Sequence, residues 1–231
     1  MATATRAGIQ CWSCNASVPT GAHFCAACGK IQPLPPGTDY FAFFGLPRKL
    51  GLDAAELEKR FHELSWKLHP DNFVRSGESE RALSLERSSQ LNDAFRTLRE
   101  PVARVEYLLA IEGARKEGTA KQQAPPELLE EVFELNESLD ELRAARSAGG
   151  SDGELAALRA KLEAAGRSFE EKLREVDTAL EAAFVRWDAA LDSGADADAR
   201  RARIAELNEI LNRRSYIRNL VRNVSEELAG A

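Results

Sequence analysis

Four cysteines near the start of the chain have the spacing of a metal site. They form two C-x-x-C pairs separated by ten residues, and they are Cys11, Cys14, Cys25 and Cys28. A C-x-x-C turn can present two sulfur atoms to one ion, so two such turns complete a tetrahedral shell of four thiolates. The pattern predicts a structural zinc ion, with iron in a rubredoxin-like site as the alternative. Gly29 follows the second pair, where a tight backbone turn favours glycine.

Other uses of these cysteines fit the sequence less well. Disulfides are rare in proteins that are not exported. A thioredoxin-like redox pair needs one C-x-x-C at a strand–helix junction, rather than two within 18 residues. A thiol-based redox sensor would need reactive thiols, which a closed metal site withholds. His23 lies between the pairs and is expected at the surface, because four thiolates already fill the shell.

A second motif, His69-Pro70-Asp71, offers an imidazole and a carboxylate at a fixed turn. Proline disfavours a helical conformation at the residue before it, so the preceding helix is expected to end near Leu68. Apolar residues recur at helical steps on both sides of the motif: Leu57, Phe61, Leu64 and Leu68 before it, and Leu91, Ala94, Phe95 and Leu98 after it. The two patterns predict an antiparallel helical hairpin with the motif in its solvent-facing loop.

The bulk composition favours a helical protein and argues against several functions. Of the 231 residues, 44% are hydrophobic and 29% are charged, and the net charge of −6 argues against a nucleic-acid partner. No apolar run approaches the roughly 20 residues that span a bilayer, so no membrane partner is expected. The first ten residues lack the apolar core of a secretory signal, and arginine outnumbers lysine, so we expect a protein of the bacterial cytoplasm. No catalytic constellation is found, and an enzyme is not expected.

The order of patterns along the chain predicts an all-α fold. Residues 1–32 form the cysteine knuckle, and the Pro-rich residues 33–38 form an extended linker that keeps its core apart from the next. Residues 39–113 hold a short aromatic helix, the hairpin and a helix opened by Pro101. Residues 114–126 form a loop. Residues 127–231 carry three apolar stripes with short breaks, which predict an antiparallel three-helix bundle.

Several of these segments together resemble a known family. D-Y-F-A-F-F-G-L-P (39–47), the His-Pro-Asp motif and L-N-D-A-F-R-T-L (91–98) resemble the J-domain of DnaJ-type co-chaperones. P-x-x-R-x-x-Y-L-L (101–109) narrows the resemblance to the HscB family of iron–sulfur co-chaperones, and the double C-x-x-C resembles its zinc-bearing branch. The likeness covers nearly the whole chain and is strongest over 39–112. It implies a co-chaperone that binds an IscU-like scaffold and stimulates ATP hydrolysis by an HscA- or DnaK-like chaperone.

The resemblance also implies a chaperone-binding surface on the hairpin. The motif residues His69, Pro70 and Asp71 would act on the ATPase domain of the chaperone. Lys59, Arg60 and Lys67 lie on the helix before the motif, and they fit either a basic docking surface or an ordinary solvated face.

A client-binding surface is implied on the first helix of the bundle. Glu130, Glu134, Glu137 and Glu141 recur at helical spacing there, which is either a solvated face or a binding face. The scaffold-contacting residues carried over from the family are Leu129, Phe133, Glu134, Glu137, Glu141 and, on the last helix, Tyr216. The rival hypothesis is a general J-domain adaptor whose bundle serves another client or mediates self-association.

Overall fold

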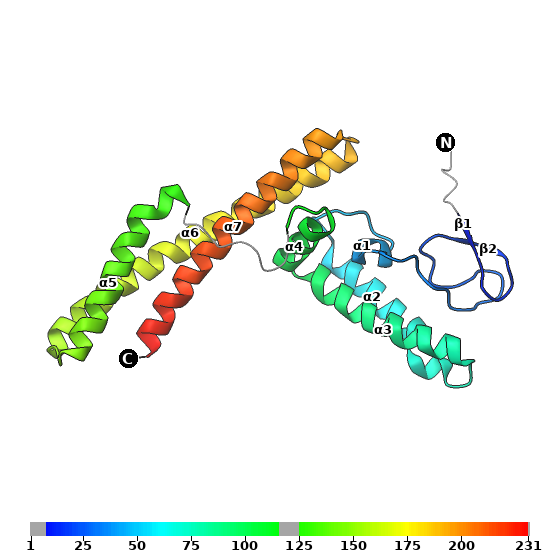
Figure 1. The fold of residues 1–231 in the computed structure, drawn as a ribbon, viewed down its shortest axis with the longest axis horizontal. Coiled ribbons are helices and arrows are strands. Elements are labelled where there is room, and N and C mark those ends of the chain that lie inside the picture. Colours follow the sequence, from blue (N-terminus) through cyan, green and yellow to red (C-terminus); the bar gives the residue numbers. More distant parts are fainter. Residues whose placement is uncertain (1–7, 116–124, 231) are drawn as a thin grey trace. The chain divides into compact units, whose positions relative to one another are not determined.

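The computed structural model describes residues 8–115 and 125–230 of the chain. The chain divides into two compact units, Met1–Ile111 and Glu112–Ala231. In the described ranges, seven α-helices accompany one two-stranded sheet (Figure 1), so the predicted all-α class is confirmed. Of the loop predicted for residues 114–126, residues 116–124 lie outside the described part. None of the helices within 8–115 and 125–230 has both the length and the apolar character needed to cross a membrane.

The first unit opens with the cysteine knuckle, residues 8–32. β1 (Gly8–Gln10) pairs antiparallel with β2 (Ser17–Pro19), and the first cysteine pair lies in the loop between them. Phe24 and Ile31 form an isolated antiparallel bridge around the second pair. Each cysteine pair is therefore held in a loop between two extended segments. The small buried core of the knuckle consists of Cys11, Val18 and Cys25.

Four helices follow in the first unit. They are α1 (Tyr40–Phe43), α2 (Ala54–Leu68), α3 (Glu78–Arg99) and α4 (Pro101–Ile111), with a 3₁₀ turn at Pro70–Phe73. Asp39 and Asp53 begin α1 and α2 because their carboxylates accept otherwise unpaired N–H groups of the first turn. α2 ends at Leu68, as the Pro70 argument predicts.

Two sets of contacts hold the α2–α3 hairpin together. Near its middle, the rings of Phe61 and Phe95 stack with centroids 4.1 Å apart. At the motif end, the Leu68 carbonyl accepts hydrogen bonds from the hydroxyls of Ser84 (2.7 Å) and Ser88 (3.0 Å). This carbonyl belongs to the last turn of α2, where no intrahelical partner remains, so the two serines satisfy a group that the end of the helix leaves open.

The knuckle keeps a small core of its own, but it also contacts the helices of the first unit, which the expectation of an extended separating linker did not include. His23, expected at the surface, is half-buried against α1: its Nε2–H donates to the Phe43 carbonyl at 2.9 Å and its ring meets the Phe43 ring edge-on. Lys30 pairs with Glu80 of α3 at 2.5 Å. Composition predicts a stiff linker but not what its two ends contact. The linker itself turns at Gly37 (φ 77°), where Thr38 N–H bonds the Pro35 carbonyl.

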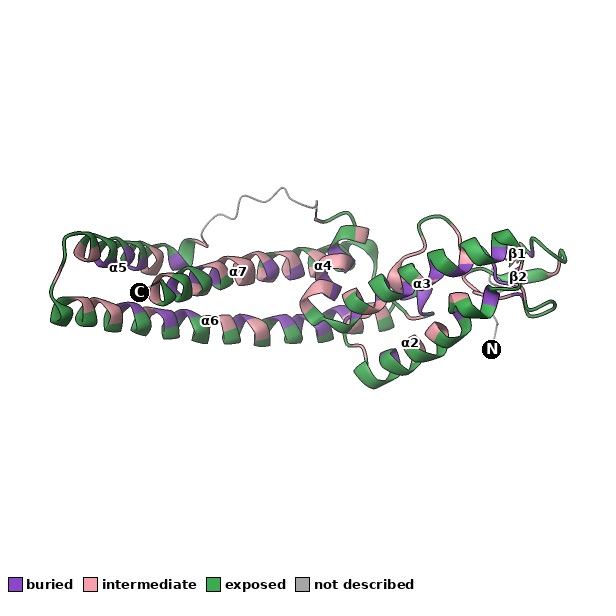
Figure 2. Cartoon of the chain, turned by 90° about the horizontal axis from the view of Figure 1, so that it is seen from below, coloured by how far each residue is buried: buried purple, intermediate pink, exposed green. Residues whose placement is uncertain are grey.

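The second unit is the predicted three-helix bundle. Its helices are α5 (Leu129–Ser147), α6 (Asp152–Asp192) and α7 (Ala197–Ala229). Ser151 and Asp196 cap α6 and α7, and Gly149 (φ 70°) and Gly194 (φ 67°) make the tight turns before them. Buried residues lie on the sides of the helices that face one another (Figure 2), and they include Leu135, Leu142, Leu162, Phe169, Ile217 and Val224.

Candidate functional site

The four cysteine side chains converge on one point in the knuckle. All four Sγ atoms lie within 4.8 Å of one another, and the pairs Cys11–Cys28 and Cys14–Cys25 are each 3.7 Å apart. A tetrahedral ion with Zn–S bonds near 2.3 Å needs sulfur atoms about 3.8 Å apart. The four thiols therefore fit one tetrahedral metal ion, which would hold together two loops that share only a small apolar core.

Both cysteine loops turn in the same way. The residue after each second cysteine has a left-handed backbone: φ is 60° at Asn15 and 71° at Gly29. The Asn15 and Gly29 N–H groups bond the carbonyls of Cys11 and Cys25, at 3.0 and 2.8 Å. The turn predicted at Gly29 is confirmed. The turn at Asn15 could have been predicted in the same way, because asparagine tolerates this conformation best after glycine.

The cysteine thiols differ in how readily they lose a proton. Burial raises the pKa of Cys11, but the backbone N–H groups of Cys14 and Ser13 more than offset this, and the pKa falls to about 6. Metal binding needs thiolates. The hydrogen bonds that lower the pKa of Cys11 therefore favour the form of this side chain that binds a metal.

The His-Pro-Asp motif is displayed at the end of α2. His69 is the C-cap of α2, and Asp71, 84% exposed, keeps its carboxylate in solvent 3.5 Å from the His69 Nδ1. The Asp71 N–H donates to the same Nδ1 at 3.3 Å, and the Asn72 side chain donates to the Trp66 carbonyl at 2.6 Å. These bonds lock the turn without using the outer oxygens of Asp71, which leaves them available to a partner.

The three cationic side chains predicted on α2 are not equivalent. Arg60 is committed within the fold, because its Nη1 donates to the Phe44 carbonyl at 3.0 Å and its Nε to Glu56 at 2.9 Å. Lys59 and Lys67 are exposed, and neither pairs with a carboxylate of the described chain. Two of the three are therefore free to meet a partner, whereas Arg60 also ties α2 to the end of α1.

The first helix of the bundle carries two exposed apolar side chains one turn apart. Leu129 is 54% and Phe133 is 71% exposed; we call them the apolar pair. Successive residues of a helix are rotated by about 100° around its axis. By this rotation, the side of α5 next to Phe133 and away from the bundle core carries Glu137, Glu141 and Glu134. These three exposed carboxylates form the carboxylate rim, of which Glu141 pairs with Lys161 at 3.1 Å.

Comparison with known proteins gives this arrangement a family. No protein-family model matches the chain. A Vibrio vulnificus protein described as a co-chaperone protein HscB homolog is 35% identical over 156 residues, which cover 67% of this chain and 85% of the relative. The chain belongs to the HscB family of co-chaperones. The mouse iron–sulfur cluster co-chaperone protein HscB is 33% identical over 133 residues, covering 56% of this chain and 57% of the mouse protein.

Solved structures of HscB proteins have a similar fold. Human HscB superposes with a TM-score of 0.57 over 95% of this chain and 98% of the human chain, at 23% identity. HscB from Vibrio cholerae gives 0.55 over 81% of this chain and 96% of its own, at 26% identity. Membership of the HscB family implies a J-domain, and the His-Pro-Asp motif lies between α2 and α3 of the first unit.

One exposed residue beside the motif escaped the sequence reasoning. Trp66, 78% exposed, lies one helical turn before His69 and lines a hollow of about 480 Å³. The other lining residues are His62, Ser65, His69, Asp71 and Asn72. Tryptophan is enriched at protein interfaces and among the residues that contribute most to binding. The signal was present in the sequence, because residue 66 falls outside the apolar stripe of α2.

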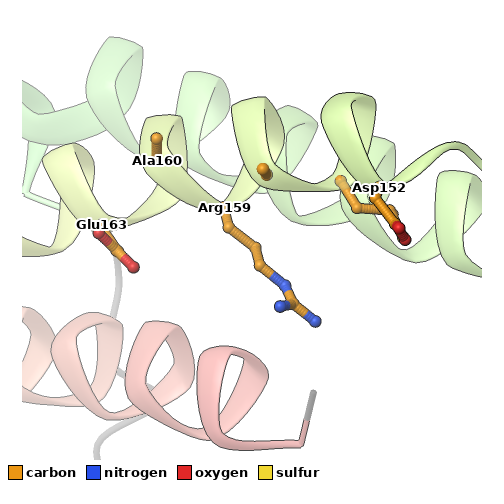
Figure 3. Close-up of a pocket in the computed structure, with 6 residues that line it drawn as sticks. Asp152, Arg159, Ala160 and Glu163 are labelled. Carbon is orange, nitrogen blue, oxygen red and sulfur yellow. The ribbon is translucent and has the colours of Figure 1, made fainter.

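Two further features of the bundle bear on the predicted site. Tyr216, predicted to contact the client, is half-buried and packs against the bundle core, so only part of its ring is available. A hollow of about 530 Å³ lies along the start of α6, where Arg159 projects from the helix between Asp152 and Glu163 (Figure 3). None of the predicted site residues lines this hollow.

Proposed function

We propose that this protein is a co-chaperone of iron–sulfur cluster biogenesis. It binds an IscU-like scaffold through the bundle and stimulates ATP hydrolysis by an HscA- or DnaK-like chaperone through the J-domain. The observation that carries this proposal is membership of the HscB family, since the mouse relative bears the name of an iron–sulfur cluster co-chaperone. Residues 39–113 act on the chaperone, and residues 127–231 hold the client. The cytoplasmic location remains a prediction from the sequence.

The J-domain part of the proposal is supported by the exposure of its polar groups. The Asp71 carboxylate and the ammonium groups of Lys59 and Lys67 lie in solvent, where they can pair with charged groups of a chaperone. Charge pairs at a rim raise the association rate more than they lower the dissociation rate. The chaperone meets the motif and these lysines together, because all of them lie on α2 or at its end.

The client part of the proposal is supported by the exposed apolar pair on α5. Small apolar anchors surrounded by polar residues are typical of interfaces, and aromatic residues contribute most of the binding free energy. We propose that Leu129 and Phe133 enter an apolar hollow of the scaffold while Glu134, Glu137 and Glu141 meet its cations. Tyr216 contributes through the edge of its ring.

The metal in the knuckle is proposed to be zinc, with a structural role. Four thiolates in a closed tetrahedral shell leave no position for a substrate, which is typical of structural zinc sites. The sulfur spacing of 3.7 Å supports a small tetrahedral ion. Iron would fit the same four ligands and is the alternative that metal analysis decides.

Phe133→Ala is expected to weaken scaffold binding by about 2 kcal/mol, roughly 30-fold in Kd, mainly through faster dissociation. The fold should be unaffected, because most of the ring is already in solvent. Glu137→Lys should instead slow association and change its salt dependence, because a rim charge steers the encounter. The measurement is titration of labelled IscU-like scaffold against each variant at two salt concentrations.

Two matched variants control for general effects on the bundle. Val185→Ala removes an equally exposed apolar side chain from α6, and Glu181→Lys reverses an exposed charge on the same helix. Both should bind scaffold like the parent. Equal affinities for all variants would place the client site elsewhere and favour the general J-domain adaptor.

Trp66→Ala is expected to raise the chaperone concentration needed for half-maximal stimulation by about tenfold. The reason is that a tryptophan that becomes buried in an interface contributes on the order of 1–2 kcal/mol to binding. The maximal stimulation should change little, since the motif itself is intact. Trp66→Phe should recover most of the affinity by keeping an aromatic face. The measurement is steady-state ATPase stimulation over a range of concentrations; an unchanged half-maximal concentration for Trp66→Ala would remove this residue from the docking surface.

A further inference from the structure

Residues on both sides of the second cysteine pair of the knuckle contact the J-domain. His23 lies two residues before Cys25, and Lys30 lies two residues after Cys28. The loop between them is closed by a hydrogen bond from the Cys25 N–H to the Lys30 carbonyl at 2.9 Å. Any change in the position of this loop therefore moves both contacts at once.

The His23 contact holds the end of α1. The last carbonyls of a helix have no intrahelical donors, and here two neighbours supply them. The Phe43 carbonyl accepts a hydrogen bond from the Nε2–H of His23. The Phe44 carbonyl accepts one from the guanidinium of Arg60 on α2. The rings of His23 and Phe43 also meet edge-on with centroids 4.7 Å apart. The knuckle and α2 thus fix α1 together, and a hollow of about 380 Å³ between them is lined by both.

The Lys30 contact holds the start of α3. Its ammonium lies 2.5 Å from the carboxylate of Glu80, a side chain that is only 6% exposed. A carboxylate removed from water is costly unless a cation and hydrogen bonds compensate. Lys30 is the cation that the structure gives to Glu80, so the first turn of α3 depends on where the knuckle places this lysine.

The cysteine cluster determines whether the loop can hold this position. The core cluster of the knuckle is small: its three buried members are Val18 and the cysteines Cys11 and Cys25. Domains this small rarely fold without a metal, and in them the free energy of metal binding becomes free energy of folding. One ion bound by the four thiolates would fix the loop that carries His23 and Lys30, and we expect the loop to loosen without it.

We propose that metal binding in the knuckle is energetically coupled to the J-domain, with His23 and Lys30 as positioning residues. The metal-loaded knuckle stabilises α1 and the start of α3. By linkage, the contacts made by the J-domain raise the metal affinity of the knuckle by the same factor. The knuckle is thus a metal-dependent brace of the chaperone-binding module. This inference concerns the chain and its metal alone, so it stands or falls independently of the chaperone and the scaffold.

The coupling predicts that a substitution on the J-domain changes metal binding at the distant thiolates. Glu80→Gln removes the charge that holds Lys30 and keeps the side-chain volume. It is expected to lower the affinity for zinc on the order of tenfold, within the usual range of coupling between sites. The measurement is competition for Zn²⁺ against a chromophoric chelator. Glu78→Gln is the matched control, because it removes the same charge two residues earlier on α3. The Glu78 side chain is exposed and pairs with no cation of the described chain.

The reciprocal effect is measured in the parent protein by amide hydrogen exchange with and without zinc. Zinc removal should speed exchange in Tyr40–Phe43 and in the first turns of α3, and it should leave α5, α6 and α7 unchanged. In Glu80→Gln the zinc-dependent difference in α3 should shrink. Equal zinc affinities for the parent, Glu80→Gln and Glu78→Gln would overturn the coupling. The coupling would also be overturned if zinc removal from the parent protein changed hydrogen exchange in the knuckle only.

Discussion

Asp71→Asn abolishes stimulation of the chaperone's ATPase and leaves the fold intact. Asp71 is the most exposed part of the motif, and its carboxylate makes no contact within the hairpin core. Asparagine keeps the size and the N–H to His69, and it removes only the charge that the partner meets. We expect stimulation to fall to the basal rate at every concentration tested. The measurement is single-turnover ATP hydrolysis by the chaperone, with circular dichroism of the variant.

The control for this prediction is Asp93→Asn. Asp93 is also exposed and lies on α3 of the same J-domain, where it pairs with Arg96 at 3.1 Å. It should stimulate like the parent. If Asp71→Asn with unchanged circular dichroism stimulated as well as Asp93→Asn, the motif would not be the acting group, and the proposed function would lose its J-domain part.

Cys11→Ser is expected to remove the bound metal. Structural zinc sites with four ligands bind with about 10–16 kcal/mol, so the loss of one thiolate weakens binding on the order of a hundredfold or more. Cys11 is also buried in the small core of the knuckle, so its loss removes a ligand from the inside of the cluster. We expect one equivalent of metal in the parent and much less in the variant, by elemental analysis after reducing, chelator-free purification.

The same experiment distinguishes the possible roles of the four cysteines in the knuckle. Ser13→Ala keeps all four thiols and should retain the metal. Zinc in the parent supports the structural role, and iron supports the rubredoxin-like alternative. Four reactive thiols and no metal in the parent would instead favour a redox sensor. Because the knuckle contacts α1 and α3, Cys11→Ser should also loosen these helices, whereas an extended linker between separate cores would leave them unchanged.

The local structure of both motifs follows from the sequence alone. Pro70 excludes His69 from the helix, so α2 had to end at Leu68 whatever packs around it. Two C-x-x-C pairs can satisfy one tetrahedral ion, and the turn after each needs a residue that tolerates a positive φ, here Asn15 and Gly29. The apolar stripes of the last hundred residues likewise require three helices that bury one face each. These features depend on backbone sterics and periodicity, which short stretches of sequence contain.

Contacts between distant segments were decided only by the tertiary structure. A Pro-rich linker fixes stiffness and reach, but it does not say that His23 meets Phe43 or that Lys30 meets Glu80. Such contacts depend on which surfaces are left unpaired after each part has folded. Arg60 shows the same limit: its sequence position suits a free basic face, yet the open carbonyl of Phe44 takes its guanidinium.

Exposure is the other property that the sequence left open. Helical spacing puts Phe133 at the border of the apolar stripe on α5, and spacing alone cannot say whether α6 or α7 covers that border. In the bundle the border stays uncovered, and 71% of the ring remains in solvent. Which side chains a partner can reach is set by how far neighbouring helices extend and at what angle they cross, and this information exists only once the helices are packed.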